Sequence, residues 1–149
     1  MQMSISLLFG TILALASGHS LSASAGAYRA TVDFRSVTFS TSNEQASYWG
    51  GGGSTPPEML VTGIRIACKG QTIRIPRSAY ADLANVNRVL IILKKGGCIL
   101  RLEGGDASVA YDADLVVRGS NLMQRWVRDG EFPENFWEKT TYYSKPPEN

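Results

Sequence analysis

The stretch Val89-Leu-Ile-Ile-Leu-Lys-Lys-Gly-Gly-Cys-Ile-Leu-Arg-Leu102 carries the clearest structural signal in the chain. It opens with consecutive apolar residues, which is typical of a strand covered on both faces. Two lysines and two glycines then predict a turn, and the residues after it alternate, with Cys98 and Leu100 on one side. A strand, a tight turn and a second strand predict an antiparallel hairpin over residues 89–102.

Shorter alternating segments occur on both sides of this hairpin. The first, residues 28–34, places Tyr28 and Phe34 on one face, and a slip in the alternation predicts a bulge near Arg35-Ser36. Because tight turns join most of the segments, their strands are expected to pair antiparallel. The other segments are residues 60–68, 71–75, 108–117 and 139–143. The sequence therefore predicts a fold of the α+β class that is mainly β, one compact domain of mostly antiparallel strands.

Three further segments show a helical spacing of apolar residues. Residues 76–84 begin with a proline, which suits a first helical turn, and Tyr80 and Leu83 would pack inward. Residues 133–137 are expected to form one helical turn, so one or two short helices complete the fold. Residues 121–128 fit both a helical and an alternating pattern, and both interpretations stay open.

Residues 1–25 have the features of a secretion signal. The apolar core from Ile5 to Ala16 is about 12 residues long, shorter than the roughly 20 residues of a membrane-spanning helix. Ala23-Ser24-Ala25 is an A-x-A pattern, so we expect cleavage after Ala25. The expected mature chain, residues 26–149, is then periplasmic or secreted, and it contains no apolar stretch that could span a membrane. The alternative is a buried N-terminal helix of the folded domain.

The expected cleavage has a chemical consequence, because the only histidine, His19, lies within the removed segment. A chain without imidazole cannot use Ser-His-Asp or Cys-His catalysis, and it lacks the histidine ligands common in zinc sites. We therefore assign no catalytic residue, no metal site and no cofactor, and a protein without enzymatic activity is favoured. The formal net charge is only +2, with no block of like charge, so no nucleic-acid partner is predicted.

The two cysteines, Cys68 and Cys98, both lie in the expected mature chain. Each sits beside a glycine turn at one end of an alternating segment, so both are expected at the same end of a sheet. An exported chain with two cysteines most simply forms one disulfide. Two separate buried thiols are the other interpretation.

Tyr48 and Trp49 precede four glycines within a long segment, residues 40–57, that is expected to be a flexible loop. Long loops are usually functional or disordered. Aromatic side chains on such a loop are effective anchors for a partner protein or a sugar ring. The other interpretation is a disordered insertion with Trp49 packed on the core. The tail, residues 144–149, is expected to fray.

Aromatic and charged residues also alternate between positions 125 and 137. Most aromatic residues in such a pattern belong to a core, and Phe132 and Phe136 could pack beneath a short helix. If the tryptophans are exposed instead, the segment forms a recognition surface together with its arginines. The candidate binding residues are Arg125, Trp126, Arg128 and Trp137.

Four carboxylates, Glu103, Asp106, Asp112 and Asp114, lie close together in the sequence. Paired carboxylates can catalyse glycoside hydrolysis, one as the acid and one as the base, and clustered oxygens can bind calcium. The simpler explanation is that these residues form a turn around Gly104-Gly105 and occupy solvated strand ends.

These patterns favour a small exported binding protein without catalytic activity, of the inhibitor or immunity type, whose partner is another protein. A glycan is the alternative ligand. A carboxylate-dependent envelope hydrolase or carbohydrate-binding domain is the second hypothesis, and it needs two of the four carboxylates in one cleft near Trp49 or Trp126. A structural or assembly subunit is the third, and it needs an exposed edge strand such as residues 28–34. The sequence does not predict the oligomeric state.

Overall fold

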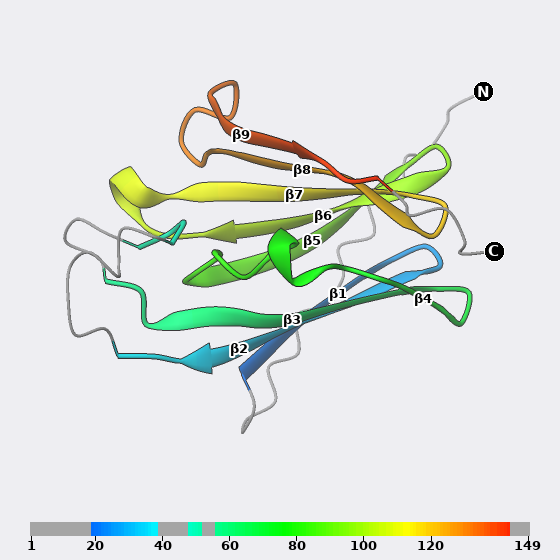
Figure 1. Cartoon of the computed structure of the whole chain (residues 1–149), viewed down its shortest axis with the longest axis horizontal. Coiled ribbons are helices and arrows are strands. Elements are labelled where there is room, and N and C mark those ends of the chain that lie inside the picture. Colours follow the sequence, from blue (N-terminus) through cyan, green and yellow to red (C-terminus); the bar gives the residue numbers. More distant parts are fainter. Residues whose placement is uncertain (1–18, 39–47, 52–55, 144–149) are drawn as a thin grey trace, which may run out of the picture.

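The computed structural model describes residues 19–38, 48–51 and 56–143, which fold mostly into antiparallel strands. The strands form two sheets that face each other (Figure 1). The helical elements among the described residues are two 3-10 turns of three residues each, η1 (Arg77–Ala79) and η2 (Ala107–Val109). The predicted predominance of antiparallel strands is therefore confirmed, and the helical part of the fold is smaller than predicted.

The first sheet has four strands in chain order, and all neighbouring pairs are antiparallel. They are β1 (His19–Ala25), β2 (Tyr28–Ser36), β3 (Met59–Cys68) and β4 (Gln71–Ile73). Strand β2 pairs with β1 on one side and β3 on the other, so the segment 28–34 is not an edge of the sheet. Its register shifts between Asp33 and Phe34, slightly before the bulge that was predicted.

The second sheet has five strands, again antiparallel and in chain order. They are β5 (Val86–Lys94), β6 (Gly97–Gly104), β7 (Tyr111–Arg118), β8 (Asn121–Asp129) and β9 (Phe136–Thr141). The predicted hairpin is the β5–β6 pair, with Lys94 opposite Gly97 at the turn. The ambiguous segment 121–128 is strand β8, because its two edges are hydrogen-bonded to β7 and β9.

Of the two predicted short helices, the first is realised only as the 3-10 turn η1, and the second is replaced by a turn and the start of β9. In residues 76–84 only η1 is helical, because the following backbone bonds to distant segments: Val61 N donates to Leu83 O at 3.0 Å and Ala84 N to Trp49 O at 2.9 Å. A helix this short is marginal in water, so these tertiary bonds outweigh it. The predicted turn at 133–137 gives way to β9 from Phe136 onward.

The inner faces of the two sheets share one core. Val32 and Ile66 from the first sheet and Leu100, Leu102 and Leu115 from the second are all completely buried. This alternation of inward apolar and outward polar residues along each strand gives the sandwich its layers. The core therefore fixes which face of β8 and β9 points inward, and that orientation decides the roles of the candidate binding residues.

Strand β1 lies in the segment that was expected to be the end of a secretion signal. It pairs with β2 along its whole length, from His19 opposite Phe34 to Ala25 opposite Tyr28. Its Leu21 side chain packs against the core. Cleavage after Ala25 would therefore remove an entire strand of the first sheet and uncover β2.

The two cysteines are free thiols in the structure, so the predicted disulfide is not supported. Cys68 ends β3 and Cys98 begins β6, one in each sheet. Cys98 is completely buried, and burial first and the neighbouring charge of Cys68 second raise the pKa of its thiol to about 11. The thiols thus share the same end of the sandwich. The tail 144–149 and most of the segment 40–57 lie outside the described residues.

Candidate binding site

Arg125 points from β8 into the interior, where only 1% of its surface is exposed. Its guanidinium donates two hydrogen bonds to the Asp82 carboxylate, at 2.6 and 2.7 Å. It also lies 3.0 Å from Glu138 of β9 and donates to the Ser78 carbonyl oxygen at 3.2 Å. Burial acts to lower the pKa of Arg125, but the bonds to Asp82 and the charge of Glu138 outweigh it, so the pKa is raised. Arg125 is therefore a buried, permanently charged clamp.

Trp49 is held in place by the same segment that Arg125 clamps. Its backbone N–H donates to Asp82 O at 2.8 Å, and its carbonyl oxygen accepts from Ala84 N at 2.9 Å. The indole stacks on that of Trp137, with 5.5 Å between ring centroids and 14° between ring planes. Two tryptophans far apart in the sequence thus meet, and each lies on a segment that supplies a carboxylate to Arg125.

Asn85 fixes the chain on both sides of the Trp49 segment. Its side-chain oxygen accepts from Glu58 N at 2.8 Å, and its side-chain nitrogen donates to Gly50 O at 3.0 Å. Asn85 itself has φ of +50°, a region that asparagine enters more readily than most residues. Tyr48, which precedes Trp49, is half-buried. Residues 48–51 are therefore docked on the sandwich.

Gly50 is required where it stands. Its φ is +81°, and a Cβ atom there would lie 2.5 Å from Ala84 O and 2.6 Å from the Tyr111 ring. Tyr111 is almost completely buried and donates its hydroxyl to Ala84 O at 2.8 Å. The glycine therefore lets the backbone next to Trp49 approach the core closely enough to dock.

The outer face of the second sheet carries the other candidate residues. Trp126 of β8 meets the Phe136 ring edge-on, with centroids 6.1 Å apart. Two cations lie over the same Phe136 ring, Lys139 at 4.0 Å and Arg128 at 5.9 Å from its centroid. Phe136 thus anchors an aromatic and cationic cluster that is distinct from the Trp49–Trp137 stack.

Three large aromatic side chains remain exposed around the start of β9. The exposed fractions are 54% for Phe132, 42% for Phe136 and 40% for Trp137. Asp129 holds the loop before the strand, because its carboxylate accepts from the N–H groups of Glu131 at 2.8 Å and Phe132 at 3.1 Å. We call Phe132, Phe136 and Trp137 the aromatic edge. Within the described residues, β9 is hydrogen-bonded to β8 alone, so its other edge is unpaired.

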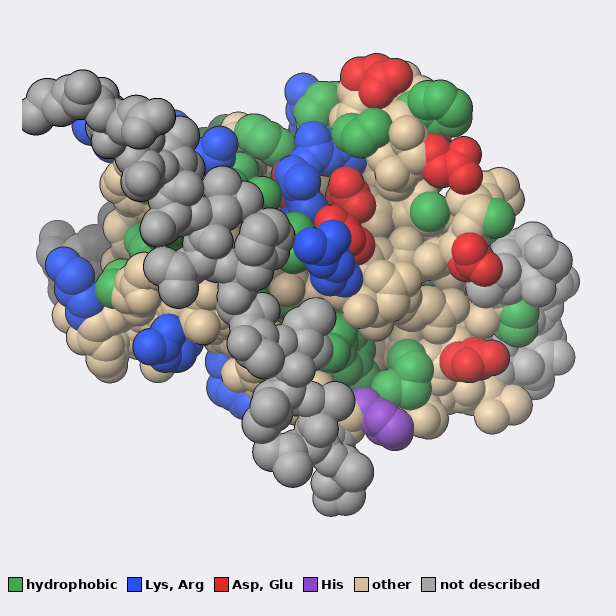
Figure 2. Space-filling view, turned by 180° about the vertical axis from the view of Figure 1, so that it is seen from behind, with side chains coloured by type: hydrophobic (Ala, Val, Ile, Leu, Met, Phe, Trp, Pro, Cys, Tyr) green, Lys and Arg blue, Asp and Glu red, His purple; other side chains and the backbone are tan. Residues whose placement is uncertain are grey.

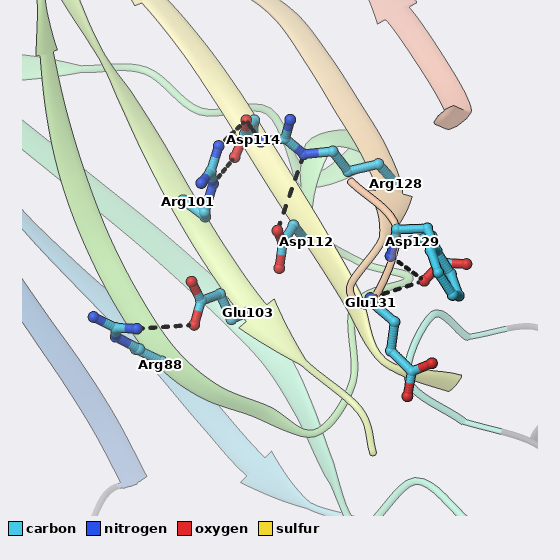
Figure 3. Close-up of polar contacts among 9 residues, drawn as sticks. Arg88, Arg101, Glu103, Asp112, Asp114, Arg128, Asp129 and Glu131 are labelled. Atoms are coloured by element: carbon cyan, nitrogen blue, oxygen red, sulfur yellow. Dashed lines mark hydrogen bonds and ion pairs between the residues drawn. The ribbon is translucent and has the colours of Figure 1, made fainter. Parts of the chain in front are cut away.

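Three of the four carboxylates noted in the sequence, Glu103, Asp112 and Asp114, lie on the neighbouring strands β6 and β7, and each contacts an arginine (Figure 3). Asp114 is 1% exposed and held between two arginines, Arg101 at 2.7 Å and Arg128 at 2.7 Å. Asp112 lies 4.0 Å from Arg128, and Glu103 lies 3.5 Å from Arg88. Asp106 is exposed in the loop before η2.

This arrangement favours a stabilising network over catalysis. The oxygens of Asp114 are occupied by the guanidinium groups of Arg101 and Arg128, so they are not free to contact a substrate. The pKa of Asp112 is raised, by burial first, while Arg101 and Arg128 act to lower it. Among the described residues, no group of three or more His, Cys, Asp or Glu side chains could hold a metal ion.

Sequence reasoning found the residue types of this site but not all of their roles. It named Arg125 as a recognition residue, whereas the structure places its side chain in the interior. It assigned Phe132 and Phe136 to a core, whereas both are exposed. Asp82 and Asn85 were missed, and only the asparagine after an apolar segment gave a signal, since asparagine is enriched at positive φ.

Comparison with protein-family models, curated proteins and solved structures finds no match to this chain. In the part of the chain that the structure describes, no helix is long and apolar enough to cross a membrane.

Replacing Arg125 by Met should lower the free energy of unfolding by about 2–3 kcal/mol, because Asp82 and Glu138 would be left together without their cation. The loss should fall below that of a fully buried pair, since both carboxylates reach solvent. Chemical denaturation measures it, and exciton coupling in circular dichroism reports the Trp49–Trp137 stack, which should weaken. The exposed Arg118→Met variant serves as the control. Unchanged stability and an unchanged exciton band in Arg125→Met would contradict the clamp.

Proposed function

We propose that this chain is a small exported binding protein without catalytic activity, of the inhibitor or immunity type, and that its aromatic edge binds an extended segment of a partner protein. The observation that carries this proposal is the exposure of three large aromatic side chains around one unpaired strand edge. Aromatic residues supply much of the binding energy in protein interfaces. Exposed clusters of this kind are uncommon on surfaces that meet only water.

The position of these side chains on β9 supports a strand-addition mode of binding. Phe136 and Trp137 lie next to each other at a bulge of the strand and belong to two different aromatic pairs, so an added strand would meet both pairs. The free N–H and C=O groups of the edge would pair with the partner's backbone. Sheet edges are usually protected by charged side chains, but Glu138 is drawn inward by Arg125 and Lys139 lies over Phe136.

The rigidity of the site supports the same proposal. Trp49 is fixed by backbone bonds to Asp82 and Ala84, and Trp137 stacks on it. Asp82 is in turn bound to Arg125. A preorganised surface loses less conformational entropy on binding than a flexible one. The clamp around Arg125 would therefore contribute to affinity without touching the partner.

Affinity capture from envelope and secreted extracts tests this function. The exported protein should retain a stoichiometric partner, and Trp137→Ala should weaken that binding about thirtyfold, which is the effect of losing a central aromatic anchor. Tyr143→Ala is the matched control, because Tyr143 is 89% exposed and lies outside the aromatic edge. Its binding should equal that of the wild type.

Hydrogen exchange of the captured complex gives the mode of binding. The β9 amides that face away from β8 should become protected when the partner binds. Equal retention by Trp137→Ala and the wild type, or protection confined to other strands, would contradict the proposed site.

The proposed export is compatible with β1 only if cleavage occurs before His19. Ala14-Leu15-Ala16 offers the same A-x-A pattern as Ala23-Ser24-Ala25, and cleavage after Ala16 keeps the whole of β1. We expect the mature protein to begin at Ser17 and to retain His19, so the proposed binding role rests on the aromatic edge and not on a lack of imidazole. Intact-mass measurement of the exported protein distinguishes the two positions. A mature chain that begins at Gly26 would show that the folded protein lacks β1.

An oxidising compartment would also allow Cys68 and Cys98 to pair. The two thiols would transfer two electrons and release two protons to an envelope disulfide oxidant, and the new S–S bond would join the two sheets. Closing a loop of about 30 residues should stabilise the fold by roughly 3 kcal/mol. Thiol titration of the exported protein under denaturing conditions should find none free, and Cys68→Ser should lower stability under oxidising conditions only. Two free thiols in the exported wild type would contradict the bond.

A further inference from the structure

Four turns meet at one end of the sandwich, on the right of Figure 1. Gly26 in the β1–β2 turn lies against the Leu93 side chain, just before the β5–β6 turn. Gly119 N in the β7–β8 turn donates to Gly96 O at 2.9 Å. The segment after β4 bridges to β8 through Arg74 and Asn121. Segments far apart in the sequence therefore form one continuous surface.

This surface collects six exposed cations, and we call it the basic end. They are Arg29, Lys69, Arg74, Lys94, Lys95 and Arg118. None of them takes part in an ion pair within the described residues. The described parts of these turns and their flanking strand ends contain no Asp or Glu. In Figure 2 the left part of the surface accordingly shows Lys and Arg, while Asp and Glu lie in the centre and on the right.

Apolar side chains are exposed at the same end. Leu93 is 53% exposed beside Lys94 and Lys95, and Tyr143 is 89% exposed after β9. Met123, whose carbonyl oxygen accepts from Tyr142 N at 2.9 Å, is 37% exposed. Burying such side chains in a lipid interface is favourable, and cations beside them remain at the headgroup level.

A pocket of about 470 Å³, lined by both polar and apolar side chains, opens beside these turns. Its lining includes Arg74, Ser78, Ser120, Asn121 and Tyr142. An arginine with hydroxyl and amide groups, and no carboxylate in the lining, suits a phosphate group with a polar substituent. A phospholipid headgroup has that chemistry.

We propose that the basic end docks on an anionic phospholipid membrane surface. The cations are distributed over separate turns rather than along a groove, so they match a broad sheet of negative charge. The exposed Leu93 and Met123 side chains gain an apolar environment in the lipid interface, which a nucleic-acid backbone or an acidic polypeptide does not provide in the same way. Each cation near such a surface strengthens binding about fivefold. This inference does not rest on the proposed function of the aromatic edge, which lies at the other end of the sandwich.

Vesicle sedimentation tests the proposal, and the protein used is the processed protein purified after export. The probes are vesicles of phosphatidylglycerol mixed with phosphatidylcholine, and vesicles of phosphatidylcholine alone. The wild type should bind only the anionic vesicles and should be released by high salt. The double variant Lys94→Gln/Lys95→Gln should partition about thirtyfold less strongly.

The matched control, Arg35→Gln/Arg88→Gln, removes two exposed cations away from the basic end. It should partition like the wild type. Because every variant has the same N-terminus, a difference in partitioning between the two double variants comes from the cations of the turns alone. Leu93→Gln should weaken binding without changing its salt dependence, since it removes only the apolar contact. Equal losses in both double variants, binding that ignores lipid charge, or tighter salt-sensitive binding to duplex DNA than to vesicles would overturn the proposal.

Discussion

The buried ion cluster around Arg125 is the constraint on which the rest of the molecule depends. A guanidinium in a core is costly unless its charge and its hydrogen bonds are satisfied, and here Asp82 and Glu138 satisfy both. Asp82 comes from the connection between the sheets and Glu138 from the last strand, so the need to neutralise Arg125 joins both to β8. The same cluster brings Trp49 and Trp137 together, because Trp49 is bonded to the Asp82 backbone and Trp137 precedes Glu138. One buried charge thus sets the geometry of the exposed aromatic surface.

The outer face of the second sheet carries a neighbouring ion cluster with the opposite charges. There Asp114 is the buried charge, and Arg101 and Arg128 are the partners that partly reach solvent. Leu115 lies opposite Arg125 and Asp114 opposite Trp126, so the two clusters occupy adjacent positions of the β7–β8 pair on opposite faces. The Arg125 cluster has one cation and two anions, and the Asp114 cluster has one anion and two cations, so their net charges cancel. This pairing favours one register of β7, β8 and β9, because a slip of one residue would expose both clusters to the wrong face.

How much could be predicted from the sequence depended on how local the deciding contact was. The β5–β6 hairpin followed from its own residues, since its partners are neighbours in the chain. Residues 76–84 were predicted to form a helix because their local pattern is helical. Their backbone instead bonds to Trp49 and Val61. The aromatic residues of the site could be nominated by type, but their pairing could not, because the Arg125–Asp82 contact spans 43 positions. Alternation and turn residues carry no information about a partner at that distance.

The distribution of charge over the surface also could not be predicted from local sequence patterns. A chain that runs back and forth places alternate turns at the same end, so single cations spaced widely in the sequence gather there. The intervening turns carry Asp106, Asp129, Glu131 and Glu134 to the other end. A net charge of only +2 therefore conceals a dipolar arrangement, with unpaired cations gathered at one end and these carboxylates at the other. An anionic surface at the basic end would orient this dipole and point the aromatic edge away from the membrane. The fold thus separates the proposed attachment surface from the proposed recognition surface by the length of its strands.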